Sequence, residues 1–600
     1  MMITKRKSGL PVMTAVLFFS LAMSVAAGAA WGQTAPNAGS LLKQTQKTVP
    51  WRKTEKPSAT APVRRERPMK KPPEAKLYVK GFTFSMDFPV VPVSELQKIV
   101  KNYEGREVTF GELDEAAGKI TRFLRDKGYF LARAYIPQQK IVGGIVRIDI
   151  IVGRAEAGKG DKVVEVEGEH KRLHASVVQN IMGDSIKTGE PLKLAELERG
   201  ILLVNDLPGV TAKADLSAGN APGTTEIKIK ENEGPLVTGL AGLDNFGNRY
   251  TGRERSLANF NINDLTGYGD QITLSGIDAG DPVFATNNGN MWLWQAGWQA
   301  PIGYTGLRAG LDYSSLGYRV GQEFSDLDLH GSARTWTLNA IYPMIRGRKY
   351  SLYGSMVFMH RNLFDATALA VSDNKRVNEA TLGLQGDAVD TLFGGGYMAY
   401  GLGVTYGDLG LGDDPDDLAT DRQTANTDGH FWKLDLNAMR LQNIGKGFSL
   451  YLAASGQYAD KNLDSSEQFI LGGPTGMRAY PVGEASGDDG LLGNVELRKD
   501  LPGAVPVIGH IQVRAFYDYG WIRLHKAAWT GWNAGDPGLD NSYVLSDAGA
   551  GINIGMAGKY LFKAFWAAKI GSNPGESAQG FDSDGQKLSS RLWFQGLYYF

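Results

Sequence analysis

Arg478, Tyr480 and Asp518 are the residues whose types and spacing could form a strong ionic contact. Arg478 and Tyr480 lie in a glycine-rich segment, Gly472–Asp488, and Asp518 follows in a later segment of alternating apolar and polar residues. A guanidinium can donate two parallel hydrogen bonds to one carboxylate, and such a pair is strong enough to hold a large loop in place. From these residues alone, an exposed arginine and a surface aspartate are the simpler interpretation.

The region that contains these residues, 233–600, is a series of segments with alternating apolarity, separated by loops rich in Gly, Asp and Asn. One face of five segments is aromatic or aliphatic: Trp292, Trp294 and Trp298; Trp336, Leu338 and Tyr342; Tyr400, Leu402 and Tyr406; Trp432, Leu434 and Leu436; Phe448, Leu450 and Leu452. The other face carries Gln295, Gln299, Thr335, Asn339, Lys433, Asp435 and Asn437. This alternation predicts a transmembrane β-barrel of about sixteen antiparallel strands, with apolar residues toward lipid and polar residues toward the lumen. A soluble sandwich or propeller is the alternative, and the aromatic outer face disfavours it.

Asp518 is predicted to lie on the inner wall of this barrel. Its segment has one apolar face, formed by Ile511, Val513, Ala515 and Tyr517, and a second face formed by Gln512, Arg514, Phe516 and Asp518. Since successive strand residues point to opposite faces, the second set faces the lumen. An inward loop at about 461–490 could then bring Arg478 to Asp518. The chain ends on an alternating segment closed by Phe600, which resembles the sorting signal of bacterial outer-membrane barrels.

Residues 1–30 have the three-part layout of a secretory signal peptide. Basic residues at positions 5–7 precede the apolar stretch Leu10–Ala27, and small residues follow. An uncleaved membrane anchor is the alternative, but Pro11 and Thr14 interrupt the apolar stretch. We therefore expect the mature chain to leave the cytoplasm.

Residues 31–76 are predicted to contain a short helix followed by an extended linker. Asn37 or Ser40 could cap the helix. Residues 43–76 hold eleven Lys and Arg against three Glu, with six prolines between. Because proline and like charge both oppose packing, this stretch is interpreted as a solvated tether.

Two small α/β modules follow, at 77–155 and 160–232, and their element order roughly repeats. The predicted elements are the strand Leu77–Met86, the helices Val93–Tyr103 and from Thr109, and the strand Val146–Val152 in the first module; and the strand Val163–Val166, the helices Leu173–Met182 and Leu192–Asn205, and the hairpin of Val210–Leu216 with Thr225–Lys230 in the second. The segment Thr109–Glu112 has the pattern of a capping box. His170 and His174 lie one helical turn apart, but no acidic or Cys residue completes a metal site, so they are interpreted as surface histidines.

The amino-acid composition excludes several kinds of functional site and partner. The chain has 600 residues, no cysteine, and 64 basic against 64 acidic residues. The absence of cysteine excludes disulfides, thiolate nucleophiles and Cys-ligated metals. Neutral charge removes the simple electrostatic case for a nucleic-acid partner. The seven histidines are scattered, and no nucleophile–base pair or phosphate-binding loop stands out. We predict no enzyme activity, no metal and no cofactor.

The chain resembles the TpsB transporters of two-partner secretion (the FhaC/ShlB/HecB type) within the Omp85 superfamily. The family's inward loop carries a Val-Arg-Gly-Tyr type motif, which reads Met477-Arg478-Ala479-Tyr480 here. Two of the four positions differ from the family motif, and Ala479 has a Cβ where the family has glycine. Three further segments are similar to the family: Gly128–Gln139, Leu203–Gly209 and Leu243–Arg253.

The resemblance implies two periplasmic POTRA domains before a sixteen-stranded barrel, and a lock in which Arg478 and Tyr480 of the inward loop act with Asp518. It implies an outer-membrane translocator of a Gram-negative bacterium that secretes an unfolded TpsA-type exoprotein, and it leaves open whether transport activates a haemolysin or adhesin. The expected partners are that exoprotein, outer-membrane lipid and the barrel assembly machinery, with the chain itself a monomer. The alternatives are an Omp85-type assembly factor for outer-membrane proteins and, less compatible with the modules, a passive porin.

Overall fold

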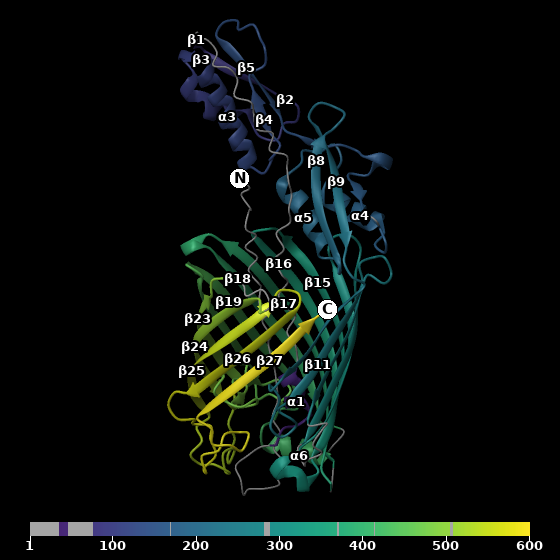
Figure 1. Ribbon diagram of the computed structural model, residues 1–600, viewed down its shortest axis with the longest axis vertical. Helices are drawn as coiled ribbons and strands as arrows, with labels where there is room; N and C mark the ends of the chain where they lie inside the picture. The colour runs from purple at the N-terminus through teal and green to yellow at the C-terminus, as the bar shows by residue number, and fades with distance from the viewer. Residues whose placement is uncertain are drawn as a thin grey trace.

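The computed structural model describes residues 35–45, 76–168, 170–280, 289–368, 371–412, 415–503 and 508–600. The predicted signal peptide and most of the basic linker lie outside these ranges. Figure 1 shows two α/β modules at one end of a large barrel, and α6 (Pro415–Gln423) at the opposite end. Within the described ranges, no helix has the length and apolarity needed to cross a membrane.

Sixteen antiparallel strands of the described chain close into the barrel. They are β10 (Val237–Asp244), β11 (Arg255–Asn263), β12 (Gln271–Ala279), β13 (Asn290–Pro301), β14 (Arg308–Arg319), β15 (His330–Arg346), β16 (Tyr350–Ala366), β17 (Val371–Asp390), β18 (Gly396–Gly410), β19 (Gly429–Gly445), β20 (Phe448–Ala459), β23 (Asp489–Asp500), β24 (His510–Arg523), β25 (Ser542–Met556), β26 (Tyr560–Lys569) and β27 (Ser590–Tyr599). Each strand pairs with its neighbour along the chain, and β10 pairs with β27 to close the circle. The predicted strand number and fold class are confirmed.

The two faces of these strands follow the sequence alternation. Trp294 and Trp336 are about half exposed on the outer face, whereas Thr335 and Lys433 are buried on the inner face. Apolar residues on the outside suit a lipid environment, and polar residues inside need partners within the lumen. The lumen is therefore where buried polar contacts must be sought.

The first module is built from two small sheets and two main helices. Its elements are β1 (Lys76–Val79), β2 (Gly81–Met86), α2 (Val93–Val100), η1 (Lys101–Tyr103), β3 (Arg106–Thr109), α3 (Phe110–Asp126), β4 (Arg133–Tyr135) and β5 (Ile145–Ile151). The capping box of Thr109 and Glu112 starts α3 as predicted. The prediction of one strand over Leu77–Met86 is wrong: β1 pairs with β3, and β2 pairs with β5 in a different sheet. The chain changes sheets at Lys80, whose N–H donates to the carbonyl of Gly144 at 2.7 Å.

The second module packs two helices on a sheet in which β9 is central. Its elements are β6 (Arg154–Ala155), η2 (Lys159–Asp161), β7 (Glu165–Glu167), α4 (Ala175–Ser185), α5 (Leu194–Asn205), β8 (Val210–Ala218) and β9 (Thr224–Glu233). The predicted hairpin is confirmed as the antiparallel pair β8–β9. The predicted helical spacing of His170 and His174 is wrong. His170 has a φ of 44° ahead of α4, and His174 is the residue that precedes the helix. His170 instead lies 3.3 Å from the buried carboxylate of Glu231.

The second module is fastened to the barrel rim beneath it. Asp206, at the end of α5, accepts two hydrogen bonds from Arg346 on β15, at 2.9 and 3.0 Å. Its carbonyl accepts a third from Arg308 on β14. Arg199 of α5 donates to the carbonyls of Pro343 and Thr305. These contacts orient the module over β14 and β15.

A short helix, α1 (Ala38–Thr45), lies inside the barrel (Figure 1). Asn37 caps it, because its side-chain oxygen accepts a hydrogen bond from the N–H of Ser40 at 3.2 Å. Leu41 and Leu42 are buried in a cluster with apolar residues of the barrel wall. The N–H of Ala38 donates to a carboxylate oxygen of Asp365 on β16 at 2.9 Å. The helix therefore occupies the lumen, with both apolar and polar contacts.

Candidate functional site

The candidate site is built around the inward loop, which we define as residues 460–488 between β20 and β23. It contains a small hairpin of β21 (Phe469–Ile470) and β22 (Ser486–Gly487). The turn at Gly476 is tight, because a Cβ there would overlap the carbonyl oxygen of Leu471. The loop is buried along most of its length, so it folds into the barrel rather than away from it.

The loop tip brings Arg478 and Asp518 together. The guanidinium donates two hydrogen bonds to the two carboxylate oxygens of Asp518 on β24, each at 2.7 Å. It also donates to Glu496 on β23. The guanidinium carbon lies 3.5 Å from the ring centroid of Phe516. We call Arg478, Asp518, Glu496 and Phe516 the tip cluster.

The tip cluster is almost completely withdrawn from solvent. The side chains of Arg478, Asp518 and Glu496 are 6%, 0% and 4% exposed. In a buried environment a bidentate ion pair is strong, and the loss of one partner leaves an uncompensated charge. The arrangement can therefore fix the loop tip against β23 and β24.

Further hydrogen bonds join the tip to β25 and β27. The hydroxyl of Tyr480 donates to the carbonyl of Ser546 on β25 at 3.4 Å, and its ring is buried. The indole N–H of Trp593 on β27 donates to the carbonyl of Arg478 at 2.7 Å. The N–H of Ala479 donates to Asp547. Ala479 has a negative φ, so its Cβ causes no backbone strain where the family pattern has glycine.

A second cluster fastens the arm of the loop, which is the part that precedes β21, to β16 and β19. Glu467 accepts hydrogen bonds from Arg361 of β16 and Lys433 of β19, each at 2.5 Å. The ammonium group of Lys43 in α1 donates to the carbonyl of Ser466 at 3.2 Å. We call Glu467, Ser466, Arg361, Lys433 and Lys43 the arm cluster. It joins three parts of the molecule: the wall, the loop and the helix.

The carboxylates around the arm cluster balance its cations. Arg361 also pairs with Glu379 of β17 at 3.0 Å, and the loop residue Asp464 pairs with Lys375 of the same strand at 2.9 Å. Sequence reasoning missed this cluster and also Glu496. The one sequence signal for the arm cluster was the alternation that places Lys433 on the luminal face, since a luminal cation in a closed barrel needs a partner.

Phe600 lies at the seam where the barrel closes. Its backbone exchanges hydrogen bonds with Gly239, at 2.9 and 3.1 Å. Its ring lies on the outer face, 5.5 Å from the ring of Phe260. The described residues contain no cluster of three His, Asp or Glu side chains that could hold a metal ion.

Comparison with known proteins decides the family. A model described as haemolysin secretion/activation protein ShlB/FhaC/HecB matches residues 223–537, and a model of the ShlB-type POTRA domain matches residues 79–153. The chain belongs to the ShlB/FhaC/HecB family. Members of this TpsB family are transporters of two-partner secretion and partners of TpsA exoproteins, so the chain is an outer-membrane translocator with POTRA structure in the periplasm.

Individual relatives agree with this assignment. The chain is 29% identical to the heme/hemopexin transporter protein HuxB of Haemophilus influenzae, over 80% of this chain and 82% of the relative. It is 24% identical to the outer membrane transporter CdiB of Dickeya dadantii, over 77% of each chain. The solved structure of CdiB from Escherichia coli has the same fold, with a TM-score of 0.70, 18% identity, and coverage of 91% of this chain and 94% of that one. The family is one of transport proteins rather than enzymes.

Proposed function

We propose that this TpsB barrel exports one unfolded exoprotein through its lumen, and that α1 and the inward loop together close the lumen at rest. The observation that carries the proposal is the bidentate pair of Arg478 and Asp518, which ties the loop tip to the barrel wall. Tyr480 supports the same tip through β25. Opening requires that the tip cluster separate or that the wall move with it.

The second module is proposed to be a second POTRA domain, so that residues 77–155 and 160–232 form a periplasmic pair. The exoprotein would bind by adding a strand to an exposed edge, since main-chain hydrogen bonds suit a partner that arrives unfolded. The strand β8 offers nine residues, and β9 is its strand partner among the described elements. Folding of the exoprotein outside the cell would drive its export.

The remaining features fit this function. Residues 1–30 would direct export across the inner membrane, and Phe600 would direct recognition by the barrel assembly machinery. The half-exposed aromatic residues of the outer face would contact membrane lipid. The barrel would act as a monomer. The name of the relative HuxB refers to heme and hemopexin, which makes a large protein that binds a haem carrier one candidate cargo.

Deletion of the gene tests the proposal. We expect one large protein to disappear from the culture medium while the other outer-membrane barrels keep their amounts, as measured by quantitative proteomics of both fractions. Restoring the wild-type chain should restore the secreted protein. A general loss of outer-membrane barrels would contradict the proposal and favour an assembly factor of the Omp85 type.

A further inference from the structure

The outer face of the barrel has a gap in its band of large apolar residues. Along one row that crosses the strands lie Leu311, Leu338, Phe358, Ala380, Tyr406 and Trp432, each paired with the next. Ala380 of β17 is the one small member, between Phe358 and Tyr406. A hollow of about 510 Å³ opens there, and its walls include both aromatic rings.

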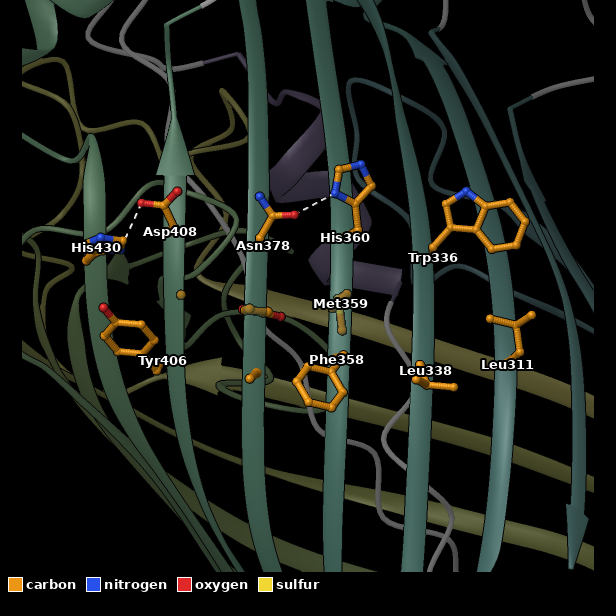
Figure 2. Close-up of a pocket in the computed structure, with 13 residues that line it drawn as sticks. Leu311, Trp336, Leu338, Phe358, Met359, His360, Asn378, Tyr406, Asp408 and His430 are labelled. Atoms are coloured by element: carbon orange, nitrogen blue, oxygen red, sulfur yellow. Dashed lines mark hydrogen bonds and ion pairs between the residues drawn. The ribbon is translucent and has the colours of Figure 1, made fainter. Parts of the chain in front are cut away.

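A row of polar side chains borders the hollow on one side. His360, Asn378, Asp408 and His430 are cross-strand partners on β16, β17, β18 and β19 (Figure 2). His360 and Asn378 lie 2.7 Å apart, and His430 and Asp408 lie 3.0 Å apart. These outward-facing groups lie next to a lipid-facing surface, where unpaired polar groups are costly.

Cations form a third tier beyond the polar row. Arg334 of β15 and Arg376 of β17 both face outward and are exposed, and Asn362 of β16 is the register partner of each. Along β16 the outward residues run from Tyr350, near the module end, to Asn362. Because the modules are periplasmic, the polar and cationic tiers lie at the extracellular end of the apolar band.

We propose that this hollow binds a phosphorylated glycolipid of the outer leaflet, of the lipid A type. One acyl chain would fill the space above Ala380, the polar row would meet sugar hydroxyls, and Arg334 and Arg376 would each meet a phosphate. The polar row spans four strands, about 14 Å at the usual strand spacing, which suits a disaccharide better than a single glycerol. The apolar, polar and cationic tiers follow the order of those groups in such a lipid.

The test uses the full-length chain purified in detergent, with lipid A and phosphatidylglycerol as separate probes in native mass spectrometry. Each arginine near an anionic lipid contributes about fivefold to binding, so the pair of changes Arg334→Ala and Arg376→Ala should reduce lipid A retention about twenty-five-fold. Ala380→Phe should also reduce it, because the added ring fills the hollow. Heat-modifiable migration on gels checks that each barrel is folded.

Matched variants distinguish this site from ordinary lipid contact. Ala438→Phe adds the same volume to the outer face of β19, away from the hollow, and should leave lipid A retention unchanged. Lys349→Ala, which removes an exposed cation in the turn between β15 and β16 at the module end, is the control for charge. The proposal would be overturned if the wild-type chain retained phosphatidylglycerol as strongly as lipid A. It would also be overturned if the control variants lost as much lipid A retention as the test variants. If Ala380→Phe does not fold, Ala380→Leu gives a smaller filling of the same space.

Discussion

The two clusters that hold the inward loop differ in what they connect. The tip cluster joins the loop to the wall alone, through one cation, Arg478, shared between Asp518 and Glu496. In the arm cluster the loop contributes the anion instead, because Glu467 is shared between Arg361 and Lys433 of the wall. It also includes Lys43 of α1, through Ser466.

This difference assigns distinct parts to the two ends of the loop. Separation of the tip cluster frees the tip but leaves α1 with its own contacts. Separation of the arm cluster removes a contact that the wall, the loop and α1 share. Because the chain has no cysteine, a single introduced cysteine can report the position of either part: Ser486→Cys in β22 of the loop, or Ser40→Cys in α1.

Arg478→Ala should have the largest effect. It leaves the carboxylate of Asp518 buried without a cation, whereas Glu496 keeps its contact with Arg498. Breaking a buried pair in this way costs roughly 3–5 kcal/mol. We expect thiol labelling of Ser486→Cys to become much faster, while labelling of Ser40→Cys changes little. Arg478→Lys, which keeps the charge without the two-pronged geometry, should lie between. Equal acceleration at both cysteines would remove the distinction between the clusters.

Glu467→Gln should have the next largest effect, roughly 3 kcal/mol, at the low end of the range for a broken buried pair, because Arg361 keeps its contact with Glu379. It leaves Arg361 and Lys433 facing each other near Lys43 without the carboxylate between them. Here labelling of Ser40→Cys should accelerate as well as labelling of Ser486→Cys. If α1 stays protected in this variant, the arm cluster does not hold the helix.

Lys43→Met sharpens the same comparison with a smaller change. The substitution removes the hydrogen bond to Ser466 and also removes a buried cation beside Arg361 and Lys433. Since these effects oppose each other, the net change in α1 retention should stay below about 1 kcal/mol. Labelling of Ser40→Cys measures it. An effect as large as that of Glu467→Gln would mean that Lys43, rather than the carboxylate, dominates the arm cluster.

Arg346→Ala provides the smallest expected effect on the lumen. It breaks the pair with Asp206 that fastens the second module to the rim, outside both clusters. Neither cysteine should change its labelling rate by more than about twofold, which corresponds to roughly 0.4 kcal/mol. Acceleration comparable to Arg478→Ala would show that the modules, and not the clusters alone, keep the loop in place.

Much of the fold could be predicted from the sequence, because strand alternation is a local signal. Trp294 and Lys433 could be assigned to opposite faces from their neighbours alone. The strand break at Lys80 could not, since both halves have the same strand character and the break depends on which distant strands pair with them. Local propensity does not encode that choice.

Part of the candidate site could be predicted from the sequence for the same reason. Arg478 and Asp518 could be named through a family motif and a strand face, and the structure brings them together. Glu467 and Lys43 have no local signature, because they come from a loop and a helix separated by most of the chain. Their meeting depends on the path of the inward loop, which only the closed barrel defines.

Whether the pair of Arg478 and Asp518 holds the lumen closed can be measured by a double-mutant cycle, read out as channel opening in planar lipid bilayers. Arg478→Ala and Asp518→Ala should each raise the open probability. The double variant should open little more than the more open of the two single variants, because both act on one contact. Fully additive effects, or channels that stay closed in all three variants, would contradict the claim that this pair holds the lumen closed.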